Sequence, residues 1–242
     1  MHIRALKTPR IEKNEPVEKI LDTILPLLEN GDILAITSKI ISLCQGQFVG
    51  KDQISKYDLI REEADLLLET PHNPYNLYLT IKEGVLLPSA GIDESNGENI
   101  YILYPKDVQK TAAFIWTYLR TKHNLQNLGI LITDSHTTPL RRGVTGIALG
   151  WCGFEPLYSY INKPDIYGHP LRVTQINILD ALATSAVFVM GEGNEQTPLA
   201  LIKNAPKISF LERPPTSEEQ KSVKIPPTED LYGPLFLSAK WT

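Results

Sequence analysis

Residues 129–136 read Gly-Ile-Leu-Ile-Thr-Asp-Ser-His, an apolar run that ends abruptly in polar side chains. A short apolar run of this kind is typical of a buried strand, so we predict a strand over 129–133. An aspartate that follows such a strand is held rigidly, which suits a metal ligand. Asp134 could equally cap a helix. His136 could act as a base, but an exposed loop histidine is the favoured interpretation.

On either side of this strand, helical and strand-like spacings follow one another irregularly. Apolar residues recur every three or four positions, which predicts helices, over 16–29, 58–69, 107–120 and 176–186. Shorter apolar or alternating runs predict strands over 33–37, 77–81, 100–104, 145–149, 187–190 and 199–202. This order is neither strict strand–helix alternation nor all strand. It therefore predicts the α+β class, with mixed sheets and flanking helices.

Composition limits the kind of protein. The chain has 242 residues, enough for one large or two small domains with a sizeable core. A hydrophobic fraction of 42% argues against wholesale disorder. The formal net charge of −4 argues against a general nucleic-acid binder. We see neither a signal peptide nor an apolar run of the ~18 residues that a membrane helix needs, so we expect a cytoplasmic protein.

Proline and cysteine give further hints about organisation. Cys44 and Cys152 fit no disulfide or metal pattern, and we expect both to be small buried hydrophobes. Proline is in excess, with 18 residues, and six of them follow residue 204. We therefore divide the chain into a main domain, 1–204, and a proline-rich C-terminal arm, 205–242.

Small polar residues follow the predicted strands. The familiar nucleotide-binding motifs are missing from the sequence. The sequence has no P-loop and no complete Gly-x-Gly-x-x-Gly fingerprint. Ser38 and Lys39 could hold phosphate oxygens, or could belong to an ordinary surface loop. Asp93 and Asn96 could serve a hard cation such as magnesium, or could bond their own turn.

Two later segments carry similar signals. In 190–197, Met-Gly-Glu-Gly-Asn-Glu-Gln-Thr, the glycines could offer backbone amides to phosphates and Glu192 could bind a metal. A glycine-rich hairpin between two strands explains this segment equally well. Arg141 follows Asp134 and could reach a bound anion. The polar turn at 167–174 is explained by a turn that caps the late helix.

In chain order, six blocks resemble the coenzyme F420:L-glutamate ligase family over about residues 6–203. The blocks are 37–42 (TSKIIS), 90–96 (AGIDESN), 132–135 (ITDS), 139–143 (PLRRG), 165–168 (DIYG) and 189–192 (VMGE). The resemblance implies a ligase that uses GTP and magnesium or manganese to join L-glutamate to a carboxylate of a small cofactor, through an acyl phosphate. It also implies the family's own fold, neither P-loop nor Rossmann, and a homodimer.

The resemblance also implies roles for particular residues. The implied metal ligands are Asp93, Asp134, Ser135 and Glu192. The implied nucleotide contacts are Pro9, Ile11, Ser38, Lys39, Asn96, Met190, Gly191 and Gly193. Lys39 and Arg141 would be catalytic, because they would neutralise phosphate charge in the transition state.

The sequence departs from the family pattern in three places, one on the nucleotide side of the implied site and two on the acceptor side. Leu43 stands where many members have a second lysine. The segments 69–74 and 135–141, which would face the acceptor, also differ. The acceptor is therefore either folate-like or a deazaflavin, and this sequence looks more like the branch associated with folate metabolism. The alternative function is a nucleotide-binding homologue that does not catalyse ligation or has another specificity.

Overall fold

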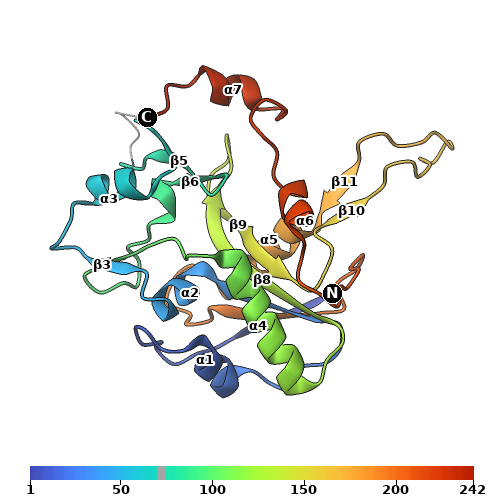
Figure 1. Ribbon diagram of the computed structural model, residues 1–242, viewed down its shortest axis with the longest axis horizontal. Coiled ribbons are helices and arrows are strands. Elements are labelled where there is room, and N and C mark those ends of the chain that lie inside the picture. The colour runs from blue at the N-terminus through green and yellow to red at the C-terminus, as the bar shows by residue number, and fades with distance from the viewer. Residues whose placement is uncertain (70–74) are drawn as a thin grey trace.

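The computed structural model describes residues 1–69 and 75–242, and a five-stranded mixed sheet lies at its centre (Figure 1). The strands, in spatial order, are β1 (His2–Leu6), β12 (Leu199–Lys203), β2 (Asp32–Thr37), β8 (Leu128–Thr137) and β9 (Val144–Cys152). Strands β2 and β8 are parallel, and the other neighbouring pairs are antiparallel. Thr37 pairs with Thr133, so the polar residues after both positions meet at one end of the sheet.

Helices cover both faces of this sheet. In β2, Ile33 and Ala35 pack against α5, whereas Leu34 and Ile36 pack with α1 and α4. All four side chains are fully buried, as expected for a continuous apolar strand that is covered on both sides. The helices of this part are α1 (Val17–Ile24), α2 (Ser38–Cys44), α4 (Val108–His123) and α5 (Ile178–Met190).

A smaller lobe with its own apolar cluster lies beside the sheet. It contains β3 (Phe48–Gly50) paired with β7 (Ile100–Ile102), the meander β4 (Leu66–Leu68), β5 (Leu79–Lys82) and β6 (Val85–Pro88), helix α3 (Lys56–Glu63) and the 3-10 turn η1 (Ser89–Gly91). Ile60 of α3 and Leu67 of β4 are buried in this cluster. The lobe brings the segment after η1 against the open end of the main sheet.

Two further segments extend from the body (Figure 1). The hairpin of β10 (Leu157–Ser159) and β11 (Gln175–Asn177) carries a long projecting loop, and we call residues 157–177 the projecting arm. The C-terminal segment contains α6 (Ser217–Ser222) and α7 (Gly233–Ser238). It returns to the smaller lobe, where Trp241 bridges to Leu68. No helix among the described residues is long and apolar enough to cross a membrane.

The α+β prediction is confirmed, and so are the strands predicted at 33–37, 145–149 and 199–202. The prediction of a strand over 187–190 is wrong, because these residues form the last turn of α5. Val187 and Met190 continue its buried stripe against the sheet, so tertiary packing outweighs the strand preference of the Val-Phe-Val run. The helix predicted over 58–69 ends at Glu63, and β4 begins three residues later. Asp107 precedes α4, but its side chain makes no capping hydrogen bond.

Candidate functional site

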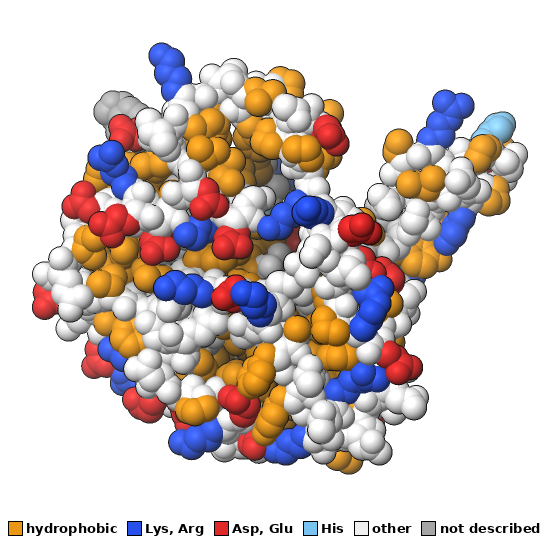
Figure 2. Space-filling model, viewed as in Figure 1, with side chains coloured by type: hydrophobic (Ala, Val, Ile, Leu, Met, Phe, Trp, Pro, Cys, Tyr) orange, Lys and Arg blue, Asp and Glu red, His pale blue; other side chains and the backbone are white. Residues whose placement is uncertain are grey.

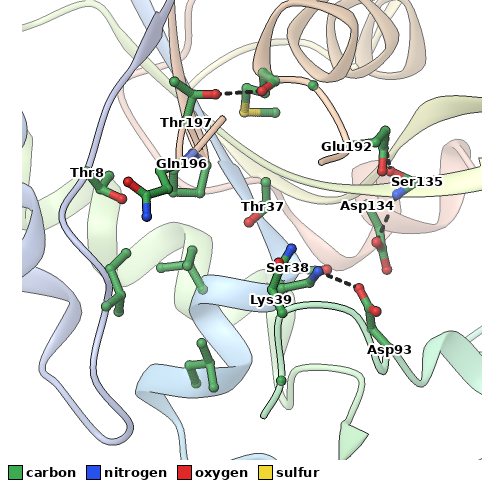
Figure 3. A pocket seen from close by; sticks show the side chains of 18 of the residues that line it. Thr8, Thr37, Ser38, Lys39, Asp93, Asp134, Ser135, Glu192, Gln196 and Thr197 are labelled. Atoms are coloured by element: carbon green, nitrogen blue, oxygen red, sulfur yellow. Dashed lines mark hydrogen bonds and ion pairs between the residues drawn. The ribbon is translucent and has the colours of Figure 1, made fainter. Parts of the chain in front are cut away.

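A cavity of about 930 Å³ opens where β2 ends beside the middle of β8 (Figure 3). Its walls come from the segment after β1, the first turn of α2, the segment after η1, the middle of β8 and the loop between α5 and β12. The residues expected from the sequence that line it are Pro9, Ile11, Ser38, Lys39, Asp93, Asn96, Asp134, Ser135, Met190, Gly191, Glu192 and Gly193. Segments far apart in the chain therefore form one site.

Helix α2 brings two adjacent side chains to two different carboxyl groups. It begins directly after β2, so Ser38 and Lys39 stand at the end of a buried strand. Hydrogen bonding by the Ser38 side chain lowers the pKa of the Asp134 carboxyl group. The Lys39 ammonium lies 2.7 Å from Oδ2 of Asp93. The surface-loop interpretation of this pair is wrong, because Ser38 is buried and both residues belong to a helix at the cavity wall.

Asp134 lies inside β8, not at its end. The strand continues to Thr137 because it stays paired with β9, and the register shifts between Ile132 and Thr133. Such an irregularity redirects the side chains that follow it. Asp134 thus lines the cavity, and the helix-capping interpretation is wrong.

Burial is the main influence on the Asp134 carboxyl group and raises its pKa to about 7. The negative charge of Asp93 acts in the same direction. The Ser135 amide donates a hydrogen bond to Oδ1 at 2.8 Å, and with Ser38 and Lys39 it lowers the pKa in part. Ionising a buried carboxyl group beside a second acid is costly. A cation bound beside the two groups would offset this cost and would therefore be stabilised there.

Asp93 both bonds its own turn and faces the cavity. Its Oδ1 accepts the amide hydrogen of Ser95 at 2.6 Å, as the turn interpretation requires. Its backbone pairs with Ile102 in both directions, which fixes the segment to β7. Its Oδ2 is left for Lys39. The turn therefore positions one carboxylate oxygen at the cavity.

The loop of residues 191–198 joins a helix to a strand, so the hairpin interpretation is wrong. Gly191 ends α5 with φ 80°, a left-handed conformation that glycine adopts without strain. The carboxylate of Glu195 accepts the amide hydrogen of Gly193 at 2.8 Å, and Thr197 donates to the Met190 carbonyl at 2.6 Å. Asn96 donates to the Gly193 carbonyl at 3.3 Å and so ties the loop to the opposite wall.

Two groups of this site were not identified from the sequence. Glu195 lines the cavity and holds the Gly193 amide; its only sequence signal is an acidic residue two positions after a glycine. Arg10 and Glu98 form an ion pair between the N-terminal segment and the segment before β7. Both line the cavity, but they are 88 residues apart, and no local pattern predicts that pairing. Leu43, the departure from the family pattern, also lines the cavity.

The three expected carboxylate ligands do not come together as one group. Glu192 accepts a hydrogen bond from the Ser135 hydroxyl at 2.6 Å, whereas Asp93 faces Lys39 (Figure 3). Over residues 1–69 and 75–242, no set of three His, Cys, Asp or Glu side chains is close enough to hold an ion. Asp93 and Asp134 remain as a pair of interacting carboxyl groups. Such a pair fits magnesium, which takes one or two carboxylates and completes its shell with water and phosphate oxygens.

The charges that line the cavity are mostly negative. Its acidic residues are Glu12, Asp93, Glu98, Asp134, Glu192 and Glu195, and its basic residues are Arg10, Lys13 and Lys39. A polyanion that entered alone would meet net repulsion. A bound cation would offset this local excess of negative charge and so allow the polyanion to bind.

Arg141 and His136 lie away from the positions expected for them. Arg141 is exposed in the turn that joins β8 to β9, and it is not among the residues that line the cavity. His136 lies within β8 and is half-buried, where burial lowers its pKa, so the exposed-loop interpretation is wrong. Of the other expected acceptor-side segment, 69–74, only Glu69 belongs to the described residues.

Comparison with known proteins gives a consistent result. The model of the F420-0:Gamma-glutamyl ligase family matches residues 5–204. The coenzyme F420:L-glutamate ligase of Methanopyrus kandleri is 27% identical, over 85% of this chain and 86% of the relative. The enzyme of the same name from Methanococcus maripaludis strain C6 is 30% identical, over 85% and 89%. That from Methanocaldococcus jannaschii is 30% identical, over 74% and 77%.

Proposed function

Since this chain belongs to the F420-0:gamma-glutamyl ligase family, we propose that it uses GTP and divalent magnesium or manganese to join L-glutamate to a carboxylate of a small cofactor. The observation that carries the proposal is the convergence in one cavity of Ser38, Lys39, Asp93, Asp134 and the 191–198 loop. Phosphate-binding groups and oxygen ligands for a hard cation are the two requirements of phosphoryl transfer.

The proposed reaction has two steps. A carboxylate oxygen of the acceptor attacks the γ-phosphorus of GTP, and the bond from that phosphorus to GDP breaks. The amine of L-glutamate then attacks the carbonyl carbon of the acyl phosphate. A carbon–nitrogen bond forms, the carbon–oxygen bond to phosphate breaks, and inorganic phosphate and one proton are released.

In these steps, the protein would position reactants and neutralise charge. Lys39 would contact the transferring phosphoryl group as a point charge, and Ser38 would keep Asp134 oriented. Asp93 and Asp134 would hold the cation, which would offset the charge of the phosphates. The excess of acidic over basic residues at the cavity supports this requirement, because GTP would bind there together with its metal ion.

The test is a ligation assay with defined acceptors. Protein, GTP, manganese and L-glutamate are incubated with a deazaflavin carboxylate in one reaction and a folate in another. We expect GDP and an acceptor that has gained the mass of one glutamyl unit. The substitution Asp134→Asn should lower turnover by about a hundredfold or more while circular dichroism stays unchanged.

A matched control for this substitution is Asp107→Asn, which makes the same chemical change at an exposed residue outside the cavity. It should keep the wild-type rate. Full turnover in the Asp134→Asn protein would contradict the proposal.

A second candidate function is nucleotide binding without ligation. It is favoured by Leu43, an apolar residue that lines the cavity where the family resemblance implies a lysine. In the same assay this function predicts saturable GTP binding, no glutamyl product with either acceptor and no gain of GDP over the control.

We also propose that the protein is a homodimer that uses the projecting arm. Ile166, Tyr167 and Val173 of that arm are 91%, 79% and 84% exposed. Figure 2 shows apolar side chains along the projection, on a part of the chain that packs against little else in this view. Exposed apolar side chains that cluster in this way are typical of a protein interface.

A further inference from the structure

Lys39 is held by three polar atoms of Asp93 and Ser95, in the segment that follows η1. Its ammonium lies 2.7 Å from Oδ2 of Asp93, 2.8 Å from Oγ of Ser95 and 3.3 Å from the Ser95 carbonyl. Its side chain is 24% exposed and that of Asp93 is 39% exposed. The lysine therefore occupies the space beside the carboxylate oxygen that a cation would use.

The same lysine also acts on the second acidic side chain of the pair. Its charge lowers the pKa of Asp134. Hydrogen bonding by the side chain of Ser38, one residue earlier on α2, lowers the same pKa. The first turn of α2 thus influences both carboxyl groups, and its only full positive charge, that of Lys39, is paired with Asp93.

We propose that Lys39 is an internal counter-ion of this site, which neutralises Asp93 when no divalent cation is bound and moves to the nucleotide phosphates when such a cation takes its place beside Asp93. This role rests on the proposed use of a nucleotide and a metal ion. The flexible four-carbon stem of lysine carries a compact charge and allows such a move.

The role has a thermodynamic consequence. A metal ion that binds without nucleotide must displace the Lys39 ammonium from Asp93. The ammonium then has no other anionic partner that replaces this ion pair. When nucleotide is present, its phosphates supply that partner. Metal and nucleotide should therefore bind with positive coupling, and the coupling should act in both directions.

The experiment measures manganese binding without catalysis. Free Mn²⁺ is followed by electron paramagnetic resonance in titrations of the wild-type protein and of Lys39→Met, each with and without GDP. Removing the competing charge should tighten Mn²⁺ binding without nucleotide by about three- to tenfold, a range that allows for solvent screening of a partly exposed pair. GDP should bind more weakly to this variant, and its enhancement of Mn²⁺ affinity should shrink.

Two control variants separate this role from a general effect of charge or folding. Lys39→Arg keeps the positive charge and should restore weak Mn²⁺ binding without nucleotide. Lys51→Met also removes one positive charge, from a lysine that lies 3.0 Å from Glu94 and outside the cavity. Its Mn²⁺ affinity should stay within about twofold of wild type.

Opposite changes in the two affinities distinguish a counter-ion from a merely structural lysine, whose loss would weaken both. The role is overturned if Lys39→Met binds Mn²⁺ no more tightly than wild type, or if Lys51→Met tightens it equally. Such a result with an active wild-type ligase leaves the proposed function intact. If the wild-type protein binds no Mn²⁺ even with GDP, the metal part of the proposed function fails as well.

Discussion

The carboxyl group of Asp134 is more stable protonated than ionised in the folded chain up to about neutral pH. Burial and Asp93 raise its pKa to about 7, whereas an unfolded aspartate has a pKa of about 3.9. Between these values the folded protein binds a proton that the unfolded chain releases. The stability that this proton contributes is complete below about pH 4 and is lost as pH rises through 7.

The metal-free protein should therefore become less stable relative to Asp134→Asn as pH rises. In urea titrations with chelator, we expect the free energy of unfolding of wild type to fall by about 2–4 kcal/mol relative to the variant between pH 4.5 and pH 8. The asparagine does not titrate, so the difference isolates this one group. Parallel pH profiles for the two proteins would show that the folded-state pKa is not raised.

At the scale of residues, the sequence predicts which side chains line the cavity better than it predicts their partners. Ser38 could be identified because it follows a buried strand, and Asp93 because it lies in a tight polar turn. The partners depend on contacts between distant segments, such as that of Lys39 with Asp93. Arg141 shows the limit: nearness to Asp134 in sequence does not bring it to the cavity, because β8 continues past Asp134 and carries the turn away.

Helix α5 and strand β9 pack with their backbones in contact. A Cβ atom added at Gly146 of β9 would lie 2.3 Å from the carbonyl oxygen of Ala183 in α5. The hydroxyl of Thr184 donates a hydrogen bond of 2.9 Å to the Gly146 carbonyl at the same crossing. A side chain at this position can be accepted only if the two elements separate.

Gly146→Ala should therefore destabilise the fold by about 2–3 kcal/mol. The neighbouring substitution Thr145→Ala, at an exposed position of the same strand, should change stability by less than about 0.5 kcal/mol. Denaturant unfolding of both variants measures the difference. An unchanged midpoint for Gly146→Ala would mean that the helix and the strand are not in direct contact in solution.

Elements were predictable where one pattern dominates, as in the buried run of β2. The prediction failed at the end of α5, where a run of β-branched and aromatic residues favoured a strand. The helical spacing of Leu182, Ala186 and Met190 was present in the sequence, but only packing on the sheet shows that it decides the structure. The polar end of β8 was missed because its side chains face the cavity and the turn, so apolar periodicity is absent there.

At the scale of the molecule, the projecting arm should decide the oligomeric state. Replacement of residues 161–173 by a two-residue Asn-Gly turn keeps a hairpin that the ends of β10 and β11 can form. We expect this protein to be monomeric by light scattering and to keep the circular dichroism of wild type. Lys163→Ala, a change within the same arm that leaves its apolar residues, should stay dimeric. A dimeric mass after the replacement would place the interface elsewhere.

The join between the projecting arm and the cavity has a mechanical consequence. Strand β11 passes directly into α5 at Asn177, which caps the helix through the amide of Asp180. The 13 residues of α5 form a rod of about 20 Å, and its last residue, Met190, lines the cavity. The buried stripe of α5 and its backbone contact with Gly146 fix the helix to the sheet between these two ends. The projecting arm and the 191–198 loop are therefore joined to the two ends of one helix that is anchored to the sheet, which fixes the position of the base of the arm relative to the cavity.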